Sequence, residues 1–97
     1  MCVQDWFRCK YRKANVGATC RGYNIIYRSF RSEYEMKVAV AEIGPLAVGI
    51  SGYSDTFRLY SGGIYDDPKC SRKLDHAVLI VGYGTDDGKD YWLVRNR

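Results

Sequence analysis

The chain has 97 residues, which is the size of one small domain or of a piece of a larger one. Hydrophobic residues make up 46% of it, so wholesale disorder is excluded, and no apolar run is long enough to cross a membrane. No signal peptide follows Met1.

The net charge of +4 is spread unevenly. Residues 8–31 hold seven basic side chains, several aromatic ones and no acidic one, a composition that can bind nucleic acid. No RNA-binding motif accompanies this stretch, and a solvated loop-and-strand surface is the simpler interpretation. We therefore expect neither a nucleic-acid nor a membrane partner.

The four cysteines, Cys2, Cys9, Cys20 and Cys70, are irregularly spaced. They contain no C-x-x-C pair and the single histidine completes no zinc pattern, so no metal site is expected. An even number of cysteines suggests disulfides and an oxidising compartment, while free buried thiols are the alternative.

The first regular element is a helix predicted at about residues 33–43. Ser32 with Glu35 is typical of a helix start, and an apolar stripe follows at helical spacing. Gly44 and Pro45 end the helix. A strand is predicted at 46–51, in which Gly49 indicates either close approach of a ligand or a tight bend of the sheet.

The last element is a β-hairpin at about residues 76–96, with a turn cluster at 85–89 between two apolar arms. The only histidine, His76, begins the first arm, and Asn96 ends the second. A loop of odd length centred on Asp86 would set His76 directly opposite Asn96 on one face, whereas a one-residue slip would separate them. An amide so placed can hold one imidazole nitrogen and leave the other free for proton transfer.

One main helix against antiparallel strands predicts an α+β fold. The neighbouring carboxylates Asp66 and Asp67 lie in a turn, and we assign them no catalytic role. A lone histidine is more often structural than catalytic, so the pair of His76 and Asn96 does not define a function by itself.

Five stretches, in order and at family spacing, resemble the C-terminal half of papain-like cysteine proteases. They are GPLAV at 44–48, FRLYSGGIY at 57–65, DHAV at 75–78, VGYG at 81–84 and YWLVRN at 91–96. Residues 9–20 are most similar to the cathepsin S branch of the cathepsin L-like group, and the resemblance extends over roughly residues 8–96.

The resemblance implies a papain-like fold, in which residues 1–97 form a partial domain: the antiparallel β half-barrel of a two-part peptidase. His76 matches the catalytic histidine and Asn96 the asparagine that orients it. Positions that bind substrate are matched by Gly49, Leu74, Asp75 and Ala77. The first, second and fourth line an apolar pocket for the second residue before the scissile bond, and Asp75 offers its carbonyl to the substrate backbone.

The nucleophilic cysteine motif and the oxyanion-hole glutamine of the family lie upstream of the matched region and are absent from this sequence. By resemblance, Cys9 and Cys70 match disulfide positions with partners outside residues 1–97, Cys20 matches an unpaired position, and Cys2 has no assignment. The expected function is therefore that of a cathepsin S/L-like cysteine endopeptidase fragment, inactive alone.

Peptide substrates and a missing N-terminal half-domain are the expected partners. No cofactor is expected, and the family implies a lysosomal or extracellular location. The alternative function is a non-catalytic module that binds peptides or a partner through exposed apolar surface.

Overall fold

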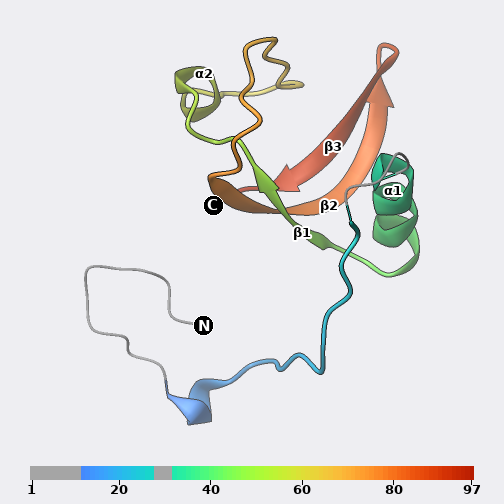
Figure 1. Ribbon diagram of the computed structural model, residues 1–97, viewed down its shortest axis with the longest axis vertical. Coiled ribbons are helices and arrows are strands. Elements are labelled where there is room, and N and C mark those ends of the chain that lie inside the picture. The colour runs from blue at the N-terminus through green and yellow to red at the C-terminus, as the bar shows by residue number, and fades with distance from the viewer. Residues whose placement is uncertain (1–11, 28–31) are drawn as a thin grey trace.

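The computed structural model describes residues 12–27 and 32–97. Its elements are η1 (Lys13–Asn15), α1 (Ser32–Glu42), β1 (Leu46–Ile50), α2 (Asp55–Arg58), β2 (His76–Asp86) and β3 (Lys89–Arg95). The strands form one antiparallel sheet in the order β1-β2-β3, with α1 packed against β1 and β2 (Figure 1). This confirms the α+β class, and the main helix and the hairpin lie within about a residue of their predicted bounds.

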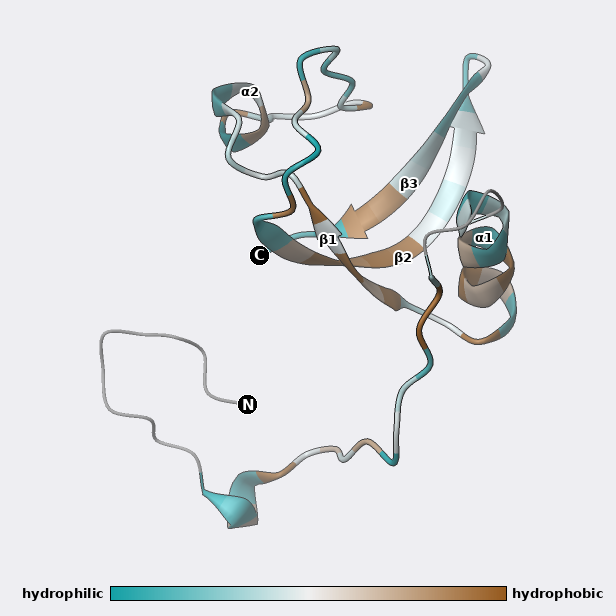
Figure 2. Cartoon of the chain, viewed as in Figure 1, coloured by the Kyte–Doolittle hydropathy of each residue, from teal (hydrophilic) through white to brown (hydrophobic). Residues whose placement is uncertain are grey.

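The sheet and α1 enclose a small core. On β1, Leu46, Val48 and Ile50 alternate with exposed residues, as a strand with one covered face requires. Val48 and Leu46 pair with Val78 and Ile80 of β2, which are 7% and 3% exposed. The hydrophobic colouring of Figure 2 gathers on β1 and the adjoining parts of β2 and β3. Among the described residues, only Ala39 of α1 joins Val78 and Ile80 as buried apolar residues.

The end of α1 follows from Gly44, whose φ of +133° is one that residues with a side chain rarely adopt. A cation–π contact also links the helix to the sheet, because Lys37 Nζ of α1 lies 4.8 Å from the ring centroid of Tyr83 on β2. Tyr83 in turn meets Trp92 of β3 edge to face, with ring centroids 6.0 Å apart. These contacts tie the helix to the hairpin.

The hairpin register differs from the prediction. The turn consists of Asp87 and Gly88, both at positive φ (47° and 75°), so Asp86 pairs with Lys89 across a loop of two residues. The predicted odd-length loop centred on Asp86 is therefore wrong. A second irregularity follows along the strands, because Ile80 pairs with Val94 but Gly82 pairs with Leu93. Val81 is the extra residue of a β-bulge.

The three strands form an open, curved sheet in the described part of the chain (Figure 1). Residues 12–27 run away from it and expose Tyr23 and Tyr27. Within residues 12–27 and 32–97, no helix has both the length and the apolar character that a membrane span needs.

Candidate active site

The site forms where β1 ends and β2 begins, at the edge of the sheet. His76 is the first residue of β2 and pairs with Ile50, the last residue of β1. Its side chain is half-buried, so the imidazole is fixed by neighbours but is still open to solvent. All the residues predicted to form the site come from this corner or from the end of β3.

His76 and Asn96 are joined by a hydrogen bond of 2.7 Å between Nε2 and Oδ1. The same Oδ1 accepts the backbone N–H of Arg97, also at 2.7 Å. An atom that accepts a backbone N–H is the amide oxygen and not the amide nitrogen, so Nε2 must carry the proton of the imidazole bond. Nδ1 is then the nitrogen left for chemistry.

The β-bulge at Val81 explains how Asn96 reaches His76 although the predicted hairpin register is wrong. With the pairing found at the turn, where residue numbers sum to 175, Asn96 would face Leu79, on the other side of the sheet from His76. Beyond the bulge the sum is 174, as in the pair of Leu79 and Arg95. Continuing that pairing sets Asn96 opposite Val78, which shares a face with His76. Asn96 therefore lies diagonal to His76 across the two strands. The prediction of direct pairing is wrong, but the contact forms.

Three residues predicted to line an apolar pocket lie together. Gly49 of β1 pairs with Ala77 of β2, and both are exposed on the face of the sheet opposite the core. A Cβ added to Gly49 would lie 3.4 Å from both Cβ and Cδ1 of Leu74. Leu74 itself is 70% exposed. Because Gly49 has no side chain, the space of one Cβ atom beside Leu74 stays open, and we call this space the apolar recess.

Asp75 fastens the segment before His76 to the end of β1. Its backbone N–H donates to the carbonyl of Ile50 at 3.1 Å, and its Oδ1 accepts the N–H of Gly52 at 2.8 Å. Two bonds in opposite directions hold this residue, so its backbone orientation is defined. The sequence did not indicate the carboxylate's partner.

A hollow opens beside the pair of His76 and Asn96. Its lining comes from the start of β2 and the end of β3: Ala77, Val78, Leu79, Arg95, Asn96 and Arg97.

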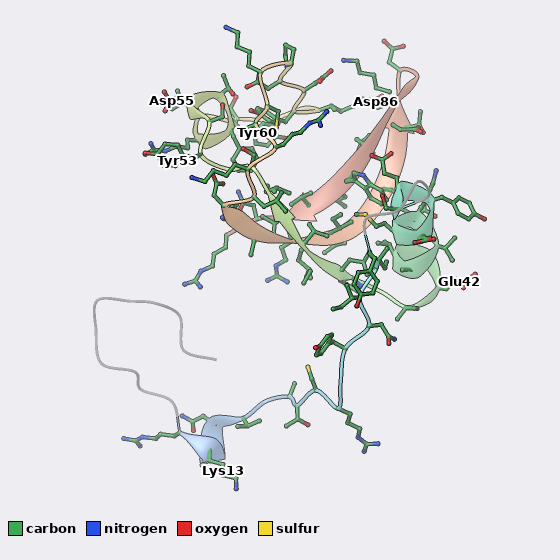
Figure 3. All side chains as sticks on the ribbon, viewed as in Figure 1. Lys13, Glu42, Tyr53, Asp55, Tyr60 and Asp86 are labelled. Atoms are coloured by element: carbon green, nitrogen blue, oxygen red, sulfur yellow. The ribbon has the colours of Figure 1, made fainter. Side chains whose placement is uncertain are left out.

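Aromatic contacts around His76 escaped the sequence reasoning. Phe57 of α2 meets the imidazole edge to face, with ring centroids 6.2 Å apart, and also meets Tyr65 at 5.4 Å. Figure 3 places α2 and the following loop, with Tyr53, Asp55 and Tyr60 labelled, over the same end of the sheet. Phe57 and Tyr65 both belong to the family motif at 57–65, but nothing in that motif indicated that Phe57 contacts His76.

Asp67 is the centre of a hydrogen-bond network that fixes α2 to the loop after it. Its Oδ2 accepts from Thr56 at 2.7 Å and from Tyr65 and Ser54 at longer range, and its Oδ1 accepts the N–H of Lys69 at 2.8 Å. The Thr56 hydroxyl, followed by the Lys69 N–H, lowers the pKa of Asp67 from its ordinary value. The turn role expected for Asp67 is thus extended by contacts with α2.

The described cysteines are both exposed and free, and neither is hydrogen-bonded to His76. Cys2 and Cys9 lie outside the described residues, as does the start of the basic segment. Within the described ranges, no three histidine, cysteine or carboxylate side chains gather into a metal-binding group. The arrangement offers an imidazole oriented by an amide on the core face of the sheet, and an apolar recess at the neighbouring residue Ala77 on the opposite face.

Comparison with known proteins identifies one family. A family profile described as "Papain family cysteine protease" matches residues 3–97. Cathepsin S of Mus musculus is 49% identical over 89 residues, which cover 92% of this chain and 26% of that protein. Cathepsin L of Sarcophaga peregrina is 49% identical over 90 residues, covering 91% of this chain and 26% of that protein.

A solved structure gives the same result for the fold. Digestive procathepsin L2 from the larval midgut of Tenebrio molitor superimposes with a TM-score of 0.76 at 45% identity, covering 93% of this chain and 28% of that one. The chain therefore spans about a quarter of the length of these relatives.

Proposed function

Because the chain belongs to the papain family of cysteine proteases, we propose that it supplies the histidine and the asparagine of a cathepsin S/L-like endopeptidase. The observation that supports this most directly is the bond of 2.7 Å between His76 Nε2 and Asn96 Oδ1. The bond lies in the corner of the sheet where Asp75 links the start of β2 to the end of β1.

In the proposed reaction, His76 acts through Nδ1. A cysteine thiol transfers its proton to this nitrogen, and the resulting imidazolium stabilises the thiolate. After the thiolate attacks the peptide carbonyl, Nδ1–H protonates the leaving amine, and water later releases the acyl group. Asn96 keeps Nε2–H engaged throughout, so the ring cannot turn its free nitrogen away from the thiol.

We assign the substrate contacts to the exposed face of the same corner. Gly49, Leu74 and Ala77 would take an apolar side chain at the second residue before the scissile bond. Asp75, held by Ile50 and Gly52, would present its backbone carbonyl to the substrate. No cofactor takes part in this chemistry.

The thiol is not supplied by these residues, since none of the four cysteines lies in the family's nucleophile motif. We therefore propose that a polypeptide of residues 1–97 alone has no peptidase activity and that the cysteine-bearing half-domain of the papain fold completes the site. The compartment that fits such an enzyme is lysosomal or extracellular.

A hybrid enzyme tests the assignment. The aligned 89-residue segment of mouse cathepsin S is replaced by the matching segment of this chain, and hydrolysis of a fluorogenic peptide is measured. We expect activity in the hybrid, a loss of about 10²–10⁴-fold in kcat for His76→Ala, and a smaller loss for Asn96→Ala. Lys73→Ala, an exposed change outside the site, is the matched control. Full activity in the His76→Ala hybrid would refute the assignment.

The isolated chain is tested with the same peptide and with an active-site-directed epoxide. Turnover that the epoxide blocks would contradict the proposal that residues 1–97 need a second half. The alternative, a non-catalytic peptide-binding module, is favoured by side chains such as Tyr53 (82% exposed) and Leu59 (81% exposed). It predicts peptide binding by the isolated chain together with an inactive hybrid.

A further inference from the structure

The one-turn helix α2 supplies the aromatic neighbour of His76, but little within the helix holds it in place. Phe57 of α2 meets the imidazole edge to face, with ring centroids 6.2 Å apart. The helix has only four residues, buries none of them and receives no side-chain cap from Ser54. A helix this short is not stable on its own, so contacts from elsewhere must hold Phe57 against His76.

The carboxylate of Asp67 provides these contacts from the loop that follows α2. Its Oδ2 accepts the hydroxyl of Thr56, the residue before Phe57, at 2.7 Å, and its Oδ1 accepts the N–H of Lys69 at 2.8 Å. Tyr65 reaches the same place with both ends of its side chain. Its hydroxyl lies 2.7 Å from Thr56 Oγ1, and its ring meets Phe57 edge to face at 5.4 Å. Phe57 is therefore held through Thr56 and Tyr65 together.

The charge of Asp67 decides the direction of these hydrogen bonds. An ionised carboxylate only accepts, so the single hydroxyl proton of Thr56 goes to Asp67. The contacts of Thr56 Oγ1 with Ser54 at 2.6 Å and with Tyr65 at 2.7 Å must then be donated by Ser54 and Tyr65. One carboxylate thus orders the hydroxyl groups of three residues.

An asparagine at the position of Asp67 would lose this order although its size is almost the same. To keep the bond from the Lys69 N–H, its amide oxygen would have to take the place of Oδ1. Its NH₂ group would then replace Oδ2 and place a donor against the hydroxyl of Thr56. The bond that anchors α2 depends on the carboxylate and not only on the shape of the side chain.

We propose that Asp67 is a positioning residue for His76: its carboxylate orders the hydroxyl groups that hold Phe57 against the imidazole. The ring then has two supports, the Asn96 bond at Nε2 and the aromatic contact from α2. Loss of the second support leaves the hydrogen bond in place and widens the range of positions open to the ring. The catalytic meaning of Asp67 rests on the proposed function, but the geometry can be tested without turnover.

The test is proton NMR of the His76 ring in the complete 97-residue chain, in which it is the only histidine. An aromatic ring shifts the resonances of nearby protons, and Phe57→Leu gives the His76 shifts without that ring. Thr56→Val removes the hydroxyl and keeps a side chain of nearly the same shape. It should move the His76 shifts roughly halfway or further toward the Phe57→Leu values, because α2 has lost its bond to a charged group. Thr56→Ser keeps the hydroxyl and should restore the native shifts.

A second pair of variants tests the carboxylate itself. Asp67→Asn should move the His76 shifts in the same direction as Thr56→Val. Asp66→Asn is the matched control, because it removes the same charge from the next residue, whose carboxylate pairs with Lys89 instead; it should leave the shifts native. Circular dichroism of each variant checks that the sheet is folded. A role in folding alone would not give recovery in Thr56→Ser together with a difference between Asp66→Asn and Asp67→Asn.

Three results would overturn the proposal: native His76 shifts in both Thr56→Val and Asp67→Asn, no recovery in Thr56→Ser, or an equal change in Asp66→Asn. The hybrid enzyme separates this proposal from the proposed function. An inactive hybrid together with the expected shifts would remove the catalytic role and leave the positioning role standing. An active hybrid together with native shifts in Asp67→Asn would remove the positioning role alone.

Discussion

Replacing Ile80 with alanine should remove much of the stability of the domain. Ile80 is 3% exposed and pairs with Leu46 on one side and Val94 on the other, so it lies at the centre of the sheet. The substitution removes three carbon groups, worth about 2.4 kcal/mol at about 0.8 kcal/mol each. The cavity left behind raises the expected loss to about 2–5 kcal/mol.

This loss is large relative to the total. A chain of this size has a free energy of unfolding of about 5–15 kcal/mol, and the buried apolar residues of the described part are only Ala39, Val78 and Ile80. We therefore expect the free energy of unfolding of this chain to be near the lower end of that range, and Ile80→Ala to remove about half of it or more. With a urea m-value of about 2 kcal/mol per molar, the unfolding midpoint should fall by about 1–2.5 M.

The assay is urea unfolding of the complete chain, followed by far-ultraviolet circular dichroism. Val81→Ala is the matched control, because Val81 is the next residue of β2 and is 37% exposed. It should cost less than about 1 kcal/mol. Equal losses for the two variants, or a native chain without a cooperative transition, would refute the claim that the sheet centred on Ile80 is the folding core.

Three further changes test the site and its supports. In the hybrid enzyme, Gly49→Ala should lower kcat/KM by about 10-fold for peptides with a large apolar residue at the second position before the scissile bond, relative to peptides with a small one there. The reason is that the added methyl fills the recess beside Leu74, and Gly62→Ala should leave the ratio of the two kcat/KM values unchanged. The contribution of the Asp67 carboxylate to the stability of the folded loop should be complete above about pH 4 and should disappear as the pH falls through its lowered folded-state pKa. Hydrogen exchange at the Lys69 amide, which donates to Asp67, should therefore become faster in acid, and Asp67→Asn should lack this step. An identical pH profile in both chains would contradict the prediction. Lys89→Met breaks an exposed ion pair of 3.1 Å with Asp66. It should lower the free energy of unfolding measured in urea by less than about 1 kcal/mol, and this loss should be smaller still in high salt. A larger loss that does not depend on salt would show a structural role for this pair.

The helix, the first strand and the two arms of the hairpin could be predicted from the sequence because their signals are local. The apolar stripe before Gly44, the alternation over β1 and the turn residues near Asp87 each act within a few positions. The site residues came from motif resemblance: His76 and Asn96 are hydrogen-bonded, whereas Gly49, Leu74 and Ala77 adjoin one another on the other face of the sheet.

The register and the supports of the site could not be predicted in the same way. The loop length depended on Asp87 adopting positive φ, and the bulge at Val81 depends on how both faces of β2 pack. The contact of Phe57 with His76 joins residues that lie far apart in the chain, so no local pattern reports it. The same is true of Thr56 and Asp67, whose side chains meet only after the loop folds back on α2.

The bulge at Val81 decides how the site responds to changes in chain length. Deleting Val81 would remove the bulge but leave Ile80 paired with Val94, so Asn96 would still lie opposite Val78. An extra residue between Val94 and Asn96 would instead set Asn96 opposite Ala77, on the other face of the sheet from His76. The position of an insertion or deletion relative to the bulge therefore decides its effect, and a sequence can keep every residue of the site and still lose the contact between His76 and Asn96.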